Sequence, residues 1–136
     1  CQDLAQISAF AKVDNSVFRM LKHTLPGPYT FILRPTQKAP KLMHSKRKTL
    51  GVRMCEHPVT QALIAAMGEP FLSATFIVPG AVEPIVYPED ISPAMRGQLD
   101  LIVDAGFCGH EPTTVIDCAD ASPTVLRQGA GPVDFL

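Results

Sequence analysis

Basic residues are scarce in the second part of this 136-residue chain, where only Arg96 and Arg127 follow residue 53. Residues 1–53 hold ten lysines and arginines and two acids, net +8, whereas residues 54–136 hold two bases and eleven acids, net −9. Such an asymmetry favours either a basic surface for an anionic partner or mutual neutralisation of the two halves within the fold. The sequence alone leaves both interpretations open.

The chain also lacks features that mark several protein classes. No apolar run approaches the length of about 18 residues that a membrane span needs, and no secretory signal begins the sequence. The four cysteines form no CxxC and no disulfide framework, so we expect reduced thiols and a cytoplasmic location. Two Cys-x-His pairs, at 55/57 and 108/110, lack the usual spacing of structural zinc ligands, so no metal is expected. Without a GxSxG or Walker-type motif, any chemistry would depend on placing reactants and stabilising charge.

Hydrophobic periodicity predicts a single α/β domain over residues 1–136. Apolar stripes with capping residues and stop signals indicate helices at 14–25 and 57–68, and a short helix within 88–98. Apolar and β-branched runs predict strands at 29–35, 49–54, 71–78, 99–106, 113–119 and 123–129. Because helices and strands alternate in the middle and strands accumulate at the end, we expect a mixed sheet.

Two hydroxyls lie on one face of the predicted strand 71–78. Since strand side chains alternate, Ser73 and Thr75 share a face with Phe71 and Ile77. Hydroxyl groups suit the oxygens of a phosphate or carboxylate, but they also satisfy neighbouring backbone groups. Either role fits this stretch.

Arg53 and Arg127 each lie on a predicted strand. Alternation places Arg53 on a face with Thr49 and Gly51, and Arg127 on a face with Val125. Arginine is rarely covered without a partner, and its guanidinium pairs well with carboxylate or phosphate oxygens. If these faces converge, they line an anion pocket made of Thr49, Arg53, Ser73, Thr75, Thr113 and Arg127. The alternative is an ion pair inside the protein, with Asp104 or Asp117.

Four segments together resemble the YrdC/YciO family in order and spacing. They are "LPGPYTFIL", "TLGVRMCEHP", "EPFLSATFIVPG" and "PTTVIDCADASPTVLRQGAG", and the likeness extends from about Asp14 onward. The family includes threonylcarbamoyl-AMP synthases, which serve the threonylcarbamoyladenosine modification of tRNA. The family's usual Ser-x-Asn reads here Thr75-Phe76-Ile77, which is similar to the YciO branch. The family's N-terminal motifs are not found, so the chain is expected to be the C-terminal two-thirds of such a domain.

The resemblance implies a twisted mixed sheet flanked by helices around a positively charged cleft. There Mg-ATP, L-threonine and bicarbonate would combine into threonylcarbamoyl-AMP with release of pyrophosphate. This implies an L-threonylcarbamoyladenylate synthase-like nucleotidyltransferase where the N-terminal part is present. The positions that match nucleotide-facing positions of the family are Thr49, Ser73, Thr113 and Arg127. Those that match positions near the threonine carboxylate and the α-phosphate are Arg53 and Thr75.

A basic connector between two predicted strands supports a different function. Its bases suggest contact with the phosphate backbone of tRNA or double-stranded RNA by a non-catalytic binding module. The candidate phosphate-contacting residues are Lys38, Lys41, Lys46, Arg47 and Lys48. An unpaired sheet edge would in addition favour a homodimer. A structural fragment without any ligand is the third alternative.

Overall fold

The structure, a computed structural model, describes residues 1–40 and 46–136. The chain forms two compact units. The first unit contains Cys1–Leu72 and Pro112–Leu136, and the second contains Ser73–Glu111. None of the helices in the described residues has both the length and the apolar content needed to cross a lipid bilayer.

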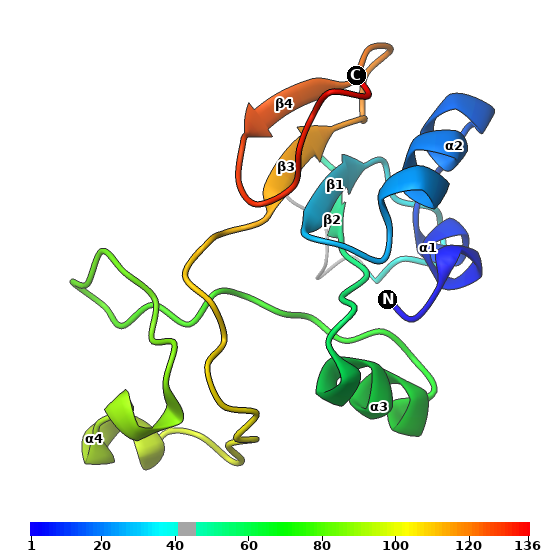
Figure 1. The fold of residues 1–136 in the computed structure, drawn as a ribbon. Coiled ribbons are helices and arrows are strands. Elements are labelled where there is room, and N and C mark those ends of the chain that lie inside the picture. Colours follow the sequence, from blue (N-terminus) through cyan, green and yellow to red (C-terminus); the bar gives the residue numbers. More distant parts are fainter. Residues whose placement is uncertain (41–45) are drawn as a thin grey trace. The chain divides into compact units, whose positions relative to one another are not determined.

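A four-stranded mixed sheet forms the centre of the first unit (Figure 1). Its strands are β1 (Tyr29–Leu33), β2 (Leu50–Val52), β3 (Thr114–Asp117) and β4 (Thr124–Arg127), in the order β2-β1-β3-β4. β1 pairs antiparallel with β2 and parallel with β3, and β3 pairs antiparallel with β4. The predicted mixed sheet is therefore confirmed, together with four of its predicted strands.

Two helices, α1 (Leu4–Phe10) and α2 (Asn15–Thr24), pack against one face of this sheet (Figure 1). Each begins after an aspartate, Asp3 or Asp14, whose side chain accepts a hydrogen bond from a backbone N–H in the first turn. This N-capping satisfies a donor that the helix itself leaves without a partner. The predicted helix at 14–25 is confirmed.

The core lies between these helices and the sheet. Along β1, Tyr29, Phe31 and Leu33 are buried, whereas Thr30 and Ile32 are only half-buried, as strand alternation requires. The buried strand residues pack in one cluster with helix residues such as Ile7, Val17 and Leu21. We call the opposite side of the sheet, which carries Thr30, Ile32 and the half-buried Val115, the Thr30 face.

A buried threonine organises the turn that follows β4. Thr114 is fully buried, and its hydroxyl accepts from the N–H of Gly129 (2.9 Å) and donates to the carbonyl of Gly131 (2.6 Å). A Cβ on Gly129 would collide with the carbonyl of Pro112, and one on Gly131 would collide with the ring of Tyr29. Both glycines are therefore needed for the chain to pass this close to the sheet.

The first unit also contains α3 (Pro58–Met67), which confirms the predicted helix at 57–68. Proline occupies its first turn, where no N–H is required, and Gly68 ends it in the left-handed conformation with φ 72°.

The second unit contains only short helical segments, a 3₁₀ turn η2 (Pro88–Asp90) and α4 (Pro93–Arg96). These fall within the short helix predicted at 88–98. The predicted strands at 71–78 and 99–106 are wrong, because the structure assigns no strand to either segment. A strand needs neighbours that pair with its N–H and C=O groups, and within the described residues no ladder forms at either place.

Candidate functional site

Two threonines and an arginine of the first unit form a cluster. Thr30 lies in β1, Thr113 immediately precedes β3, and Arg127 ends β4. The hydroxyl oxygens of Thr30 and Thr113 are 2.9 Å apart. Arg127 donates from Nε (3.1 Å) and Nη2 (2.9 Å) to the carbonyl of Thr113, and Nη2 also reaches the Thr113 hydroxyl at 3.3 Å. We call Thr30, Thr113 and Arg127 the threonine–arginine cluster.

The register of β3 with β4 explains how Arg127 reaches this position. Val115 is opposite Arg127, but its neighbour Ile116 is opposite Val125, so the register shifts by one residue between them. Residues directly opposite each other in antiparallel strands have side chains on the same face. Arg127 therefore shares the Thr30 face with Val115, whereas Val125 is opposite a fully buried core residue. The predicted common face of Arg127 and Val125 is wrong, because this bulge interrupts the alternation.

Two arginines fall on one row across the sheet. Thr30 is opposite Val115 in the parallel pair of β1 and β3, and Val115 is opposite Arg127. The register of β1 with β2, continued by one residue past the end of β2, sets Arg53 opposite Thr30. Because neighbouring strands are about 4.8 Å apart, the arginines at the two ends of this row are about 14 Å apart at the backbone. Two long side chains at this separation can contact one ligand that lies across the row.

Neither arginine is neutralised by a described residue. Arg127 is exposed, and its partners are the uncharged carbonyl and hydroxyl of Thr113. The exposed Arg53 side chain makes no hydrogen bond or ion pair with any residue in 1–40 or 46–136. Among residues 1–40 and 46–136, no carboxylate pairs with either guanidinium, so both keep their positive charge and have donors for a ligand.

The alternative prediction was an ion pair of Arg53 or Arg127 with Asp104 or Asp117. The structure instead pairs Asp117 with Arg47. Asp117 is buried, and its carboxylate accepts from Arg47 (3.1 Å) and from the backbone N–H of Ala119 (2.9 Å). Asp104 accepts from the backbone N–H of Gly106. Among the described residues, neither carboxylate pairs with Arg53 or Arg127.

Thr49, Gly51 and Arg53 were predicted to share one face of a strand. Their burial does not fit this prediction. Thr49 is buried, with 8% of its surface exposed, whereas Gly51 and Arg53 are exposed. β2 begins only at Leu50, so regular alternation does not extend back to Thr49. A Cβ at Gly51 would lie 3.8 Å from the methyl group of Thr30, which shows how near this glycine is to the cluster.

Ser73 and Thr75 belong to the second unit, where both are exposed. Their predicted common face rested on the strand 71–78, which does not form. A hydrogen bond from the N–H of Ile77 to the carbonyl of Thr75 instead marks a local turn (3.1 Å). Their part in an anion site stays a prediction.

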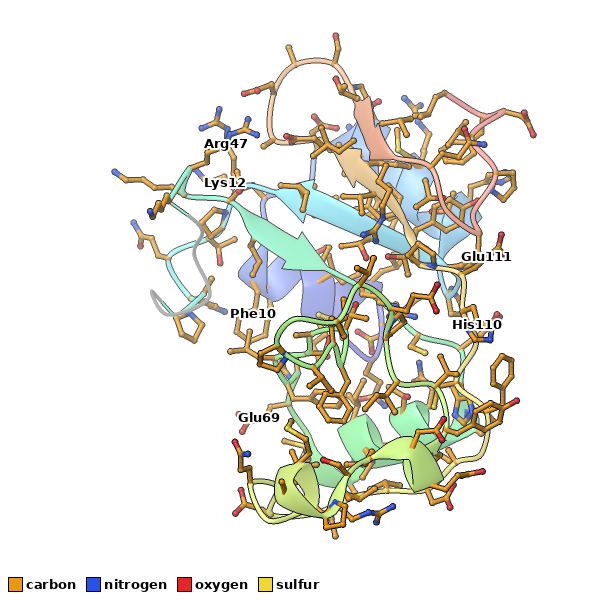
Figure 2. The ribbon with its side chains drawn as sticks, turned by 90° about the vertical axis from the view of Figure 1, so that its left-hand side faces the viewer. Phe10, Lys12, Arg47, Glu69, His110 and Glu111 are labelled. Carbon is orange, nitrogen blue, oxygen red and sulfur yellow. The ribbon has the colours of Figure 1, made fainter. Side chains whose placement is uncertain are left out.

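The basic connector is partly neutralised. Arg47 pairs with Asp117 and Asp120 (3.1 and 3.6 Å), and Arg34 pairs with Asp120 (3.0 Å). Figure 2 shows Arg47 on the loop that leads into β2. Mutual neutralisation of the two halves of the sequence therefore occurs at these arginines. Lys38, Lys46 and Lys48 are exposed and make no ion pair with a described residue, and Lys41 lies outside the described residues.

Thr30 is the member of the cluster that our sequence prediction missed. The sequence does contain a pattern that indicates Thr30. In "YTFIL", strand alternation places the Thr30 side chain on the face opposite to the large side chains of Tyr29 and Phe31. A small polar residue between large apolar ones on a central strand indicates a face that is not part of the core.

Potential metal ligands and the Cys118 thiol were the other candidates for chemistry in the part of the chain that the structure describes. Residues 1–40 and 46–136 contain no group of three or more potential metal ligands among His, Cys, Asp and Glu. Burial raises the pKa of the Cys118 thiol to about 11, with a further contribution from Asp117. This thiol is therefore protonated at neutral pH and is a poor nucleophile.

A separate hollow of about 380 Å³ lies at the C-terminal end of α2. It is lined by His23, Thr24, Tyr29, Pro132, Asp134 and Phe135. The hydroxyl of Tyr29 donates to the carbonyl of Pro132 (2.8 Å), and burial raises the pKa of Tyr29, with Asp134 contributing. None of the predicted site residues lines this hollow.

The family model Sua5_yciO_yrdC, described as telomere recombination, matches residues 1–129. The chain belongs to this family. It is 45% identical over 134 residues to the uncharacterized protein YciO of Escherichia coli (strain K12), covering 98% of the chain and 65% of the relative. The crystal structure of E. coli YciO superposes with a TM-score of 0.92 at 44% identity, covering 98% of this chain and 66% of that one. The predicted similarity to the YciO branch and the predicted YrdC-like fold are both confirmed.

Relatives whose names state an activity are more distant. The threonylcarbamoyl-AMP synthase of Xanthomonas oryzae pv. oryzae (strain PXO99A) is 37% identical over 104 residues, covering 75% of the chain and 54% of the enzyme. The structure of P. abyssi Sua5 complexed with L-threonine shares the fold, with a TM-score of 0.82 at 24% identity over 93% of this chain and 38% of that one. These relatives give no support to a module that only binds RNA. Binding of tRNA, use of bicarbonate and self-association stay predictions.

Proposed function

We propose that the row from Arg53 to Arg127 binds anionic groups of the reactants in a threonylcarbamoyl-AMP synthase-like reaction. The reactants would be Mg-ATP, L-threonine and bicarbonate. The observation that carries this proposal is the state of Arg127, whose guanidinium is oriented by a carbonyl rather than neutralised by a carboxylate. The identity of the reactants is what the family resemblance implies, and it is supported by relatives named threonylcarbamoyl-AMP synthase and by a relative solved with L-threonine.

The chemistry of this reaction requires such a surface. Threonine and bicarbonate give a carbamate and water. A carbamate oxygen would then form a bond to the α-phosphorus of ATP while the bond from that phosphorus to pyrophosphate breaks, so two negatively charged groups must come together. Fixed cationic donors lower the energy of bringing two anions together, and they need no reorganisation when the charge moves. In this proposal Thr49, Thr113 and Arg127 serve the nucleotide, and Arg53 serves the threonine carboxylate and the α-phosphate. Ser73 and Thr75 belong to the second unit, so the roles that the family resemblance implies for them stay separate predictions.

The chain spans about 65% of the length of its YciO relative, so the proposal concerns the share of the site that these residues carry. Binding is therefore the property to measure first. Titration calorimetry of the 136-residue chain with Mg-ATP is expected to show saturable binding. Arg127→Ala should weaken it by about 1.5–3 kcal/mol, the usual contribution of a hydrogen bond to a charged group.

Arg19→Ala is the matched control, because Arg19 is an exposed arginine of α2 and no described residue pairs with it. It removes the same charge from the chain and should leave the affinity for Mg-ATP unchanged. Equal losses in both variants would mean that only net charge attracts the nucleotide. Unchanged affinity in Arg127→Ala would contradict the proposed site.

A further inference from the structure

The hydroxyl protons of the threonine–arginine cluster can be counted. Thr30 and Thr113 each carry one O–H proton, and one of the two protons is used in the 2.9 Å hydrogen bond between them. Neither hydroxyl makes another hydrogen bond as a donor to a residue in 1–40 or 46–136. One O–H donor of this pair is therefore free, whichever threonine donates within the pair.

The arginine decides which of the two protons is free. Nη2 of Arg127 donates to the Thr113 hydroxyl oxygen at 3.3 Å, so this oxygen already accepts from a cation. A hydroxyl that accepts a hydrogen bond becomes a better donor, because the bonds in a chain polarise one another. The geometry allows either threonine to donate within the pair, and polarisation by Arg127 favours donation from Thr113 to Thr30, which leaves the Thr30 proton at the free end.

We infer that the Thr30 hydroxyl is a ligand-binding donor, polarised by Arg127 through Thr113, for an anionic oxygen of a phosphate or a carboxylate. Thr30 is half-buried and lies between Arg53 and Arg127 in the row described above. Gly51 has no side chain to cover it from the neighbouring strand. This inference rests on the proposed function and adds to it a residue that the family resemblance did not supply.

Three variants test the inference. Thr30→Val keeps the shape of the side chain and its preference for a strand but removes the donor. It is expected to weaken binding of anionic probes by about 10- to 100-fold, as for other hydrogen bonds to charged groups. Thr30→Ser restores the hydroxyl and should stay within about threefold of the parent chain. Thr113→Val leaves the Thr30 proton in place and should cost less affinity than Thr30→Val.

The probes are Mg-ATP, tripolyphosphate, L-threonine and adenosine, each titrated into the folded chain by calorimetry. A loss for Mg-ATP and tripolyphosphate identifies a phosphate oxygen as the acceptor, and a loss for L-threonine alone identifies the carboxylate. Adenosine has no anionic oxygen, so its binding should not respond to Thr30→Val. Thermal unfolding of each variant shows that the chain remains folded.

The results separate this inference from the proposed function. If Thr30→Val binds every anionic probe as tightly as the parent chain while Arg127→Ala binds them more weakly, the role of Thr30 is overturned and the proposed site is kept. A larger loss in Thr113→Val than in Thr30→Val would also overturn it, because the free proton would then belong to Thr113. A parent chain that binds no anionic probe would overturn both.

Discussion

Replacement of Thr114 by valine should destabilise the first unit strongly, although valine has almost the same shape. The Thr114 side chain is fully buried and its hydroxyl makes two hydrogen bonds, to Gly129 and Gly131. The substitution leaves the N–H of Gly129 and the carbonyl of Gly131 without this partner in a place where water has little access. Each lost bond with an unsatisfied partner costs about 1–2 kcal/mol, so we expect a total of about 2–4 kcal/mol.

Urea unfolding followed by circular dichroism measures this change. The midpoint should fall while the slope of the free energy of unfolding against urea stays constant, since the surface exposed on unfolding is the same. Thr124→Val is the matched control, because Thr124 is exposed in β4 and should change stability by less than about 0.5 kcal/mol. A Thr114→Val variant as stable as this control would refute the account of the turn after β4.

Two further predictions concern the same sheet. Asp117→Asn should lower the free energy of unfolding by about 1 kcal/mol, because it removes the charge that Arg47 faces at 3.1 Å while the amide oxygen still accepts from Ala119. The effect should diminish in 1 M salt, as urea unfolding at two salt concentrations will show. The second prediction follows from burial, which raises the pKa of Cys118 from its ordinary value of 9.0 to about 11. As pH rises from 9 towards 11, the unfolded thiol ionises before the folded one, so stability should fall, and Cys118→Ser should remove that part of the fall.

Both predictions have controls within the chain. Asp120→Asn changes a carboxylate that is 66% exposed, so its effect should be smaller than that of Asp117→Asn. Cys108→Ser changes an exposed cysteine and should leave the alkaline pH dependence of stability as it is in the parent chain. An Asp120→Asn effect larger than that of Asp117→Asn, or the same alkaline pH dependence in Cys118→Ser and the parent, would contradict these explanations.

The sequence predicted the regular elements of the first unit well, because their signals are local. Alternation in β1, the aspartate before α2 and the proline at the start of α3 each act within a few residues. The segments 71–78 and 99–106 are apolar enough for strands, but local composition does not show whether a neighbouring strand is there to pair with them. Strand formation depends on that neighbour, so these two predictions failed.

The same distinction applies to the candidate site. Arg53 and Arg127 were singled out because bases are rare in their part of the sequence or because they share a face with hydroxyls. The bulge that turns Arg127 to the face of Val115 depends on the register of two strands, which no periodicity reveals. The partner of Asp117 was likewise missed, since Arg47 lies 70 residues away in the chain.

Arg127 donates two hydrogen bonds to the backbone carbonyl of Thr113, and any amino acid at position 113 would supply this carbonyl. Substitution at position 113 would therefore alter the chemistry beside the guanidinium without releasing the guanidinium itself. If Arg127 binds an anion as proposed, single substitutions at position 113 can change what is recognised beside the arginine while the guanidinium stays in place. Position 113 can therefore change its side chain without loss of the backbone contact that holds the positive charge of Arg127 in place.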